Sequence, residues 1–318
     1  MWTMAESLKV FFSAALVRRL ASDIQRVQPA FEARAFIQKA STGLDQLELL
    51  ARGKHIAQAL RDHLPDTYPE AIDVLLRSLG PVHASDELVG GGMTPFYYLP
   101  HTLFVAEHGL EHFALSMRAQ YELTQRFTAE SSIRAYIQRD PERTFAQLTS
   151  WAADESAHVR RLVSEGTRLR LPWATRVPWL DANPGRVLAL LELLKADPTT
   201  LVRRSVANNL NDLSKVQPDL VVETCRAWLQ TPSPETHAMV RHALRSLIKR
   251  GHRGALGLLG AGARPKVVLR AARLSAKSIH LGGDIAFSFT LDSTASRTQE
   301  LVVDYAVHFV KASGAQRP

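Results

Sequence analysis

The segment DESAHVRR, residues 154–161, aligns without a gap with DPTTLVRR, residues 197–204, at an offset of 43 residues. A weaker third copy follows at an offset of 38 residues, where Val202-Arg-Arg corresponds to Val240-Arg-His. A period near 40 residues, with an acidic residue in the turn and Val-Arg at the start of the next helix, is typical of HEAT repeats. Because one helix pair cannot bury its own apolar face, the pairs must stack into a curved solenoid with a concave surface.

Apolar residues recur at helical spacing from about residue 6 to residue 260, as Leu49, Ile56 and Leu60 illustrate. Short turn signals interrupt this pattern at intervals that suit helices of ordinary length. These signals are Gln28-Pro29, Leu64-Pro65, Gly90-Gly91-Gly92, Asp140-Pro141, Asn183-Pro184-Gly185, Asp197-Pro198, Gln217-Pro218 and Pro232-Ser233-Pro234. We therefore predict a mainly α-helical chain in which residues 1–262 form a domain of HEAT-like repeats.

After residue 265 the apolar residues alternate instead, first at Val267, Leu269 and Ala271 and then within residues 285–289 and 303–309. This pattern predicts three or four strands, whereas a stable sandwich of two sheets needs about seven. We expect residues 266–318 to form a partial β-domain with open sheet edges, which is either truncated or completed by a partner. We also expect this segment to be loosely ordered in solution.

The formal charge of +8 favours a polyanionic partner. Nine of the 39 basic residues are lysine and the other 30 are arginine, whose planar guanidinium suits phosphate. A GC-rich coding sequence would also favour arginine, so composition alone leaves both explanations open. Cys225, the single cysteine, lies in the apolar stretch VVETCRAWL, which favours a packing residue over a nucleophile. No run of 18 apolar residues is present, so we expect no membrane contact.

Residues 158–176, HVRRLVSEGTRLRLPWATR, combine five arginines with one acid, Glu165, and one aromatic residue, Trp173. Cations beside an aromatic residue are typical of nucleic-acid contact surfaces. The alternative is that one arginine of each Val-Arg-Arg unit pairs with the repeated aspartate inside the repeat. The arginines that we predict to contact DNA are Arg160, Arg161, Arg168, Arg170, Arg203 and Arg204.

Three acids lie among apolar residues in the sequence, which is unusual for acids on a solvent-exposed surface. Glu165 precedes Gly166 at an expected helix C-terminus, where the helix dipole disfavours a carboxylate without a cationic neighbour or ligand. Pairing with Arg161, four residues earlier, would also satisfy it. Glu130 lies in RFTAESSIRAYI, and Asp212 lies in SVANNLNDLSK, where clustered asparagines indicate either helix capping or a functional site.

Several catalytic signatures are missing from the sequence. It contains no phosphate loop ending in GK[ST], no HExxH motif and no G-x-S-x-G motif. His108 and His112 have the spacing of a metal pair on a helix, but no third ligand accompanies them. We therefore expect neither a metal nor an organic cofactor.

Four blocks carry a specific resemblance: FVAEHGL (104–110), YELTQRFTAESSIRAYI (121–137), WAADESAHVRRLVSEGTRLRLPWA (151–174) and VRRSVANNLNDLSKVQPDLV (202–221). They resemble the AlkC branch of the HEAT-like-repeat DNA alkylation repair glycosylases. The resemblance implies base-excision repair, in which positively charged alkylated bases, chiefly 3-methyladenine, are removed from duplex DNA without deep base flipping. It also implies an immunoglobulin-like domain after the repeats.

By the same resemblance, Glu130, Glu165 and Asp212 are the acids that face the lesion, and Trp173 packs near the deoxyribose. We expect Glu165 to be the principal electrostatic stabiliser, with Asp212 or Glu130 orienting the water. The protein is expected to be a cytoplasmic monomer of bacterial type that associates with the nucleoid through DNA.

Two other functions remain open at the level of sequence. Helical-repeat solenoids mostly act as recognition surfaces, so the chain could be a non-catalytic module that binds DNA or protein. Three acids placed beside phosphates argue against a pure DNA binder, since each would repel the ligand. The second alternative is a sensor that recognises alkylated DNA without cutting it.

Overall fold

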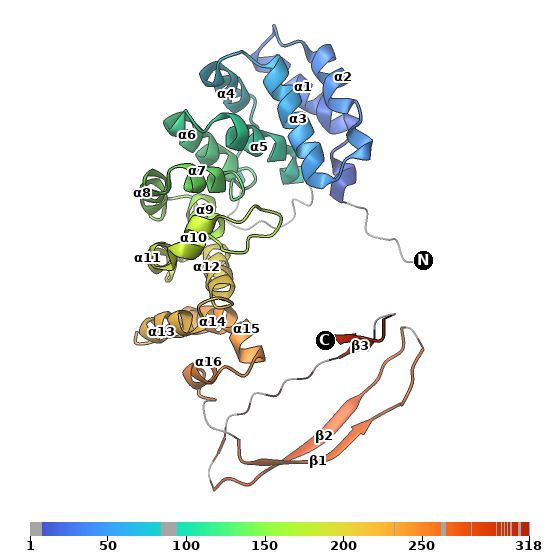
Figure 1. The fold of residues 1–318 in the computed structure, drawn as a ribbon, viewed down its shortest axis with the longest axis vertical. Coiled ribbons are helices and arrows are strands. Elements are labelled where there is room, and N and C mark those ends of the chain that lie inside the picture. The colour runs from blue at the N-terminus through green and yellow to red at the C-terminus, as the bar shows by residue number, and fades with distance from the viewer. Residues whose placement is uncertain are drawn as a thin grey trace.

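The computed structural model describes the chain except for residues 1–7, 84–93, 232, 262–264, 281, 297, 300, 302, 304, 306, 311–312 and 318. The described helices stack side by side into an arc, and a long β-hairpin follows the last of them (Figure 1). The Gly90-Gly91-Gly92 turn signal lies outside the described residues. The predicted fold class, a helical-repeat solenoid followed by β-strands, is confirmed.

The first half of the arc consists of eight α-helices and three short 3-10 helices within the described residues. Their bounds are η1 (Leu8–Phe11), α1 (Ala14–Val27), α2 (Ala33–Ser41), η2 (Leu44–Gln46), α3 (Leu49–His63), α4 (Tyr68–Arg77), η3 (Thr94–Tyr98), α5 (Leu99–His108), α6 (Phe113–Thr124), α7 (Ile133–Arg139) and α8 (Pro141–Trp151).

The second half contains the helices that carry the sequence repeat. Their bounds are α9 (Ala157–Gly166), α10 (Pro178–Ala182), α11 (Pro184–Leu194), α12 (Thr200–Leu213), α13 (Pro218–Trp228), α14 (Pro234–Ala243), α15 (Arg245–Lys249) and α16 (Arg253–Leu258). The prolines of the predicted turn signals at 141, 184, 218 and 234 each occupy the first position of a helix, where the missing N–H costs nothing.

The repeat unit is a helix pair joined by a five-residue turn. Residues 152–156 join α8 to α9, residues 195–199 join α11 to α12, and residues 229–233 join α13 to α14. In the first two turns the repeated aspartate accepts a backbone N–H two residues later: Asp154 Oδ1 binds the N–H of Ser156, and Asp197 Oδ1 that of Thr199, both at 2.8 Å. The two aspartates therefore build the same turn.

The first arginine of each Val-Arg-Arg unit stabilises this turn from the following helix. Arg160 Nη1 donates to the carbonyls of Asp154 and Glu155, and Arg203 Nη1 donates to the matching carbonyls of Asp197 and Pro198. Arg160 also reaches forward to the Asp197 carboxylate, with Nε–Oδ2 at 2.6 Å and Nη2–Oδ1 at 3.1 Å. One partly buried arginine thus links two successive repeats.

Apolar side chains from every helix pair merge into one continuous core that extends from Phe12 to Ala255. In Figure 1 the helices α8, α11 and α13 lie along the left edge of the arc, and α9, α12 and α15 lie nearer the hairpin. The acids predicted from sequence lie on α9 and α12 or directly before α7, so the site falls on this second layer of helices.

The β-hairpin consists of β1 (Val267–Leu274) and β2 (Phe287–Ser293), which pair antiparallel from Val267–Ser293 to Leu274–Phe287. An irregularity between Arg270 and Arg273 includes Ala271, whose φ of 50° is left-handed. Two further short strands, β3 (Phe309–Val310) and β4 (Gln316–Arg317), form a separate pair.

The third strand expected over residues 303–309 is found only at its end, and residues 302, 304 and 306 lie outside the description. Large apolar side chains of the hairpin, such as Leu269 and Phe287, are more than half exposed. The division of the chain into domains 1–262 and 266–318 stays a prediction, although the last helix ends at Leu258 and the first strand begins at Val267.

Candidate active site on the second layer of helices

Close packing at the end of α9 brings the three predicted acids together. Glu165 and Gly166 form the last turn of this helix, as the sequence predicts. A Cβ on Gly166 would stand 2.5 Å from the Ile133 side chain, so only glycine lets α9 approach the start of α7 this closely. Glu130 lies three residues before that start.

The asparagines of α12 connect neighbouring helices and do not cap the helix. Asn209 is fully buried, and its Nδ2 donates to the Ser164 carbonyl at 2.8 Å and to Thr167 Oγ1 at 3.0 Å. Asn211 Oδ1 accepts the backbone N–H of Ser246 from α15. These side chains bind the ends of α9 and α15, and they fix α12, and with it Asp212, against the helices on either side.

One guanidinium lies between two of the acids. Arg168 Nη1 binds Glu165 Oε1 at 2.6 Å, and Arg168 Nε binds Asp212 Oδ2 at 2.9 Å. The second oxygen of Glu165 accepts the Ser205 hydroxyl at 2.5 Å, and the second oxygen of Asp212 accepts Lys215 Nζ at 3.1 Å. Both carboxylates are buried, so Arg168 covers them.

A second guanidinium continues this network to the third acid. Arg161 Nη2 lies 3.0 Å from Glu130 Oε2 and 3.8 Å from Glu165 Oε1. The Thr128 hydroxyl donates to the same Glu130 oxygen at 2.7 Å. Pairing between Arg161 and Glu165 is thus present but long, and the principal partners of these two residues are Glu130 and Arg168, respectively.

We call Glu130, Glu165, Asp212, Arg161 and Arg168 the acid–arginine cluster. With Lys215 it contains three acids and three bases, so its formal charges cancel. Burial acts to lower the pKa of Arg168, but the carboxylates of Glu165 and Asp212 more than offset it and the pKa is raised. Because the acids are neutralised in place, a polyanion can approach them without strong repulsion.

Arg134 is a site component that sequence reasoning missed. It is buried on α7, and Nε donates to the Thr175 carbonyl at 2.9 Å, while Nη1 donates to the carbonyls of Gly166 at 3.0 Å and Arg168 at 2.7 Å. Burial lowers its pKa to about 10. Arg134 therefore holds both ends of the 167–177 loop. Its position inside IRAYI, between apolar residues, was the available signal.

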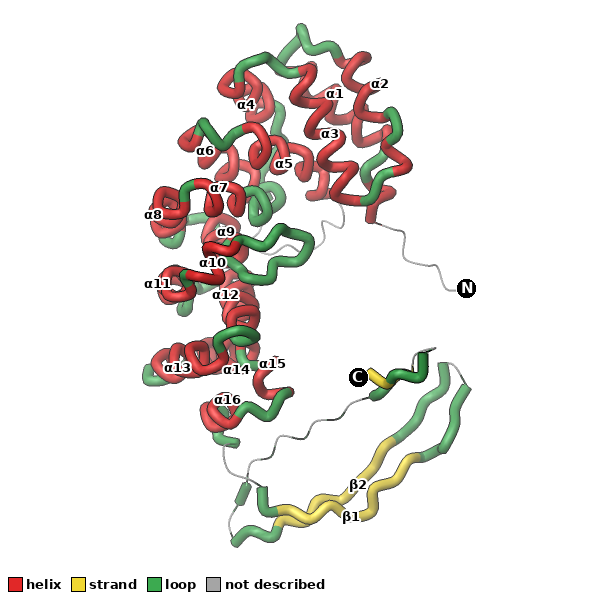
Figure 2. Tube along the Cα trace, viewed as in Figure 1, coloured by secondary structure: helices red, strands yellow, loops and turns green. Residues whose placement is uncertain are grey.

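The 167–177 loop carries Trp173 and connects α9 to α10. Figure 2 shows a loop in this position projecting away from the helices, toward the side of the arc on which the hairpin lies. Trp173 has a left-handed backbone with φ of 61°, and its side chain is 62% exposed. A large exposed aromatic residue on a strained backbone is a feature that folding alone does not require.

The predicted DNA-contacting arginines divide into two groups. Arg160, Arg161, Arg168 and Arg203 are engaged by carboxylates or turn carbonyls of the protein. Arg170 and Arg204 are exposed and form no ion pair or hydrogen bond with the residues that the structure describes. The alternative expected an arginine–aspartate pair inside each repeat; there Arg160 and Arg203 bind the aspartate's backbone carbonyl, and the ion pair of Arg160 with Asp197 reaches the next repeat.

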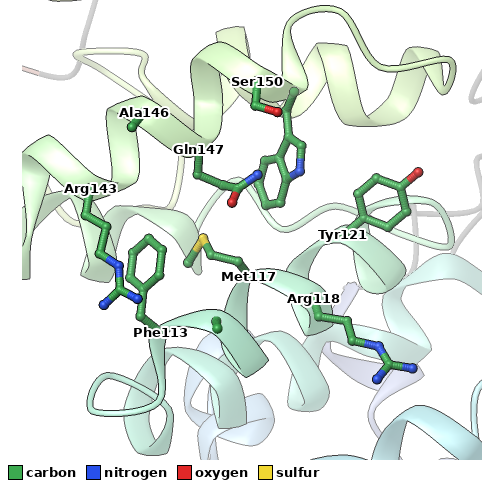
Figure 3. A pocket seen from close by; sticks show the side chains of 10 residues that line it. Phe113, Met117, Arg118, Tyr121, Arg143, Ala146, Gln147 and Ser150 are labelled. Carbon is green, nitrogen blue, oxygen red and sulfur yellow. The ribbon is translucent and has the colours of Figure 1, made fainter.

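Other parts of the solenoid are hollowed as well. A cavity of about 590 Å³ lies between α6 and α8, and Figure 3 shows Phe113, Met117 and Arg143 around it. None of the predicted site residues lines it. Among the described residues no group of three or more His, Cys, Asp or Glu is arranged to hold a metal ion, and no helix is long and apolar enough to cross a membrane.

Comparison with known proteins relates this architecture to a family. Residues 126–247, which include every member of the acid–arginine cluster, match the model for "DNA alkylation repair enzyme". Residues 268–318 match the model for the C-terminal Ig-like domain of uncharacterised protein YhaZ. The solenoid and the strands after it thus define a helical-repeat protein of the DNA alkylation repair class with an Ig-like C-terminal segment.

Two individual proteins agree with this class. The structure of Pseudomonas fluorescens alkylpurine DNA glycosylase AlkC, bound to DNA containing an abasic site analog, superposes with a TM-score of 0.86 at 38% identity, covering 98% of this chain and 84% of that one. Uncharacterized protein YhaZ of Bacillus subtilis (strain 168) is 34% identical over 308 residues, which is 96% of this chain and 82% of YhaZ. The chain belongs to the AlkC-type family of DNA alkylation repair glycosylases.

Proposed function

We propose that this protein hydrolyses the N-glycosidic bond of cationic alkylated bases in duplex DNA, chiefly 3-methyladenine, without drawing the base into a deep pocket. The observation that carries the proposal is the acid–arginine cluster, in which three carboxylates converge around two guanidinium groups. The cluster lies within the part of the chain that matches the alkylation repair family, and the structure of the relative AlkC is bound to DNA containing an abasic site analog.

The chemistry needs carboxylates more than it needs a general acid. A cationic alkylated base is already a good leaving group, so the barrier lies in the developing positive charge on the sugar and in placing a water. Glu165 is the principal stabiliser of that charge in this proposal, and Asp212 or Glu130 orients the water. Trp173 packs against the deoxyribose beside the lesion.

DNA would release the acids by exchanging partners. Arg168 covers Glu165 and Asp212 in the free protein, and both carboxylates are buried beneath it. A backbone phosphate is a second strong acceptor for the same guanidinium. When Arg168 or Arg161 turns to a phosphate, a carboxylate loses its counter-ion and becomes available to the cationic sugar. The catalytic charge is therefore exposed only where DNA is bound.

The test is the release of free base from methylated duplex DNA by the wild-type chain, with the released bases separated and identified by mass. We expect 3-methyladenine to be released and unmodified DNA to remain intact. Tight binding to methylated DNA without release would instead support the lesion sensor. Equal binding to methylated and unmodified DNA without release would support the non-catalytic module, and either result would overturn the proposal.

A further inference from the structure

The last residue of each Val-Arg-Arg unit occupies an equivalent position on three successive repeat helices. These residues are Arg161 on α9, Arg204 on α12 and His242 on α14. Arg161 is paired with acids of the cluster, but Arg204 is exposed and has no ion pair within the described chain. The equivalent positions of the next two repeats therefore carry basic residues that lie beyond the acids of the cluster.

His242 and Arg245 are held together by one amide of α12. Asn208 Oδ1 accepts from His242 Nε2 at 3.1 Å and from Arg245 Nη2 at 3.0 Å, and Arg245 Nη1 donates to the His242 carbonyl at 2.6 Å. These bonds fix both side chains without neutralising them, because every acceptor is uncharged. Arg204 and His242 also line a common groove of about 380 Å³ between α12 and α14.

Arg204 and Arg245 disfavour the charged form of His242 in the free protein. Burial lowers the pKa of His242, and the charges of Arg245 and Arg204 lower it further. Burial likewise lowers the pKa of Arg245, which lies in the field of Arg168 and Asp212. An anion bound among them would relieve this repulsion.

We propose that Arg204, His242 and Arg245 form a binding site for a backbone phosphate of the DNA strand, one repeat beyond the acid–arginine cluster. Two guanidinium groups and an imidazole offer several N–H donors to the non-bridging oxygens of a phosphodiester. The site rests on the proposed function for the presence of DNA, but it uses none of the acids that the reaction needs.

Phosphate binding at this site would take up a proton. The charged groups around His242 are Arg203 and Arg204 on α12, Glu235 and Arg241 on α14, and Arg245 on α15. Arginines and an exposed glutamate keep their charges between pH 6 and pH 8, so His242 is the group that titrates. Since phosphate favours the imidazolium, DNA affinity should be higher at pH 6 than at pH 8.

The experiment measures binding of unmodified duplex DNA as a function of salt for wild type, Arg204→Gln, His242→Gln and Arg226→Gln. Arg226 is a matched control because it is an exposed arginine on α13, outside the groove. We expect Arg204→Gln to weaken binding roughly tenfold and to reduce the log–log salt slope by about 1. His242→Gln should remove the rise in affinity between pH 8 and pH 6, and Arg226→Gln should leave both unchanged.

Wild-type slopes and wild-type pH dependence in both groove variants would overturn the phosphate site. Base release measured on the same preparations separates this failure from failure of the proposed function. If the wild type releases base and the groove variants bind like wild type, only the phosphate site is wrong. If no preparation releases base but Arg204→Gln still reduces the log–log salt slope of DNA binding, the phosphate site stands and the proposed glycosylase function is wrong.

Discussion

Replacement of Arg134 by methionine tests whether a buried arginine holds the loop that bears Trp173. Arg134 donates three hydrogen bonds to the carbonyls of Gly166, Arg168 and Thr175. The bond to Gly166 is buried and the other two are partly buried, and a buried carbonyl that loses its donor costs about 1–3 kcal/mol. Methionine would remove the cost of burying the guanidinium, which offsets part of this penalty. We expect the free energy of unfolding to fall by about 2–4 kcal/mol.

The matched control is Arg139→Met on the same helix, whose side chain is 61% exposed and paired with the exposed Glu111. An exposed ion pair contributes at most about 1 kcal/mol, so this control should remain near wild type. Urea denaturation gives the free energies, and base release under single-turnover conditions reports the position of Arg168. If Arg134→Met unfolds at the wild-type urea concentration and releases base at the wild-type rate, the guanidinium does not hold the loop.

Three further perturbations follow from the geometry. Burial lowers the pKa of His101 to about 4, so its imidazole stays neutral in the folded chain, whereas the unfolded chain binds a proton below about pH 6.5. Between pH 7 and pH 5 the free energy of unfolding of wild type should therefore fall by about 2 kcal/mol more than that of His101→Leu. Urea titrations measure both free energies, and parallel curves against pH would refute this. Asp197→Asn breaks the bidentate ion pair with Arg160 and should lower the free energy of unfolding by about 3 kcal/mol. Glu142→Gln, at the exposed ion pair with Arg186, should lower it by less than about 1 kcal/mol. Equal melting temperatures for the two variants would contradict the link between repeats. Trp173→Ala should change stability by no more than about 0.5 kcal/mol because the side chain is exposed, yet should slow base release; an unchanged release rate would exclude a contact with the sugar.

The sequence predicted the solenoid because its repeat is carried by the turn itself. Asp154 and Asp197 build identical turns, and prolines at the first helical position fix the helix starts, so these signals are local. The strands were harder to place. Among the described residues, the alternating segments fall within or beside β1 and β2, but neither strand alternates in burial, because almost all of its residues are exposed. Strands with two exposed faces are weakly specified by alternation alone.

The sequence was enough to select the acids of the candidate site, but it did not predict which arginine pairs with which acid. The unusual setting of Glu165 at a helix C-terminus indicated a cationic neighbour, and Arg161, one turn earlier on the same helix, was the candidate. The structure uses Arg168 instead, because the chain turns after Gly166 and brings Arg168 between two helices. Arg134 was missed, and the partners of Asn209 could not be predicted, because the partners of both residues lie 32 to 45 residues away.

The most direct measurement is the single-turnover rate of base release for wild type, Glu165→Gln, Asp212→Asn and Glu155→Gln on methylated duplex DNA. Glu155 is exposed and lies in the turn before α9, so its loss changes the same charge outside the cluster. We predict that Glu165→Gln slows release by at least about 100-fold, that Asp212→Asn also slows release, and that Glu155→Gln keeps the wild-type rate. Wild-type rates for both Glu165→Gln and Asp212→Asn would contradict a catalytic role for the acid–arginine cluster.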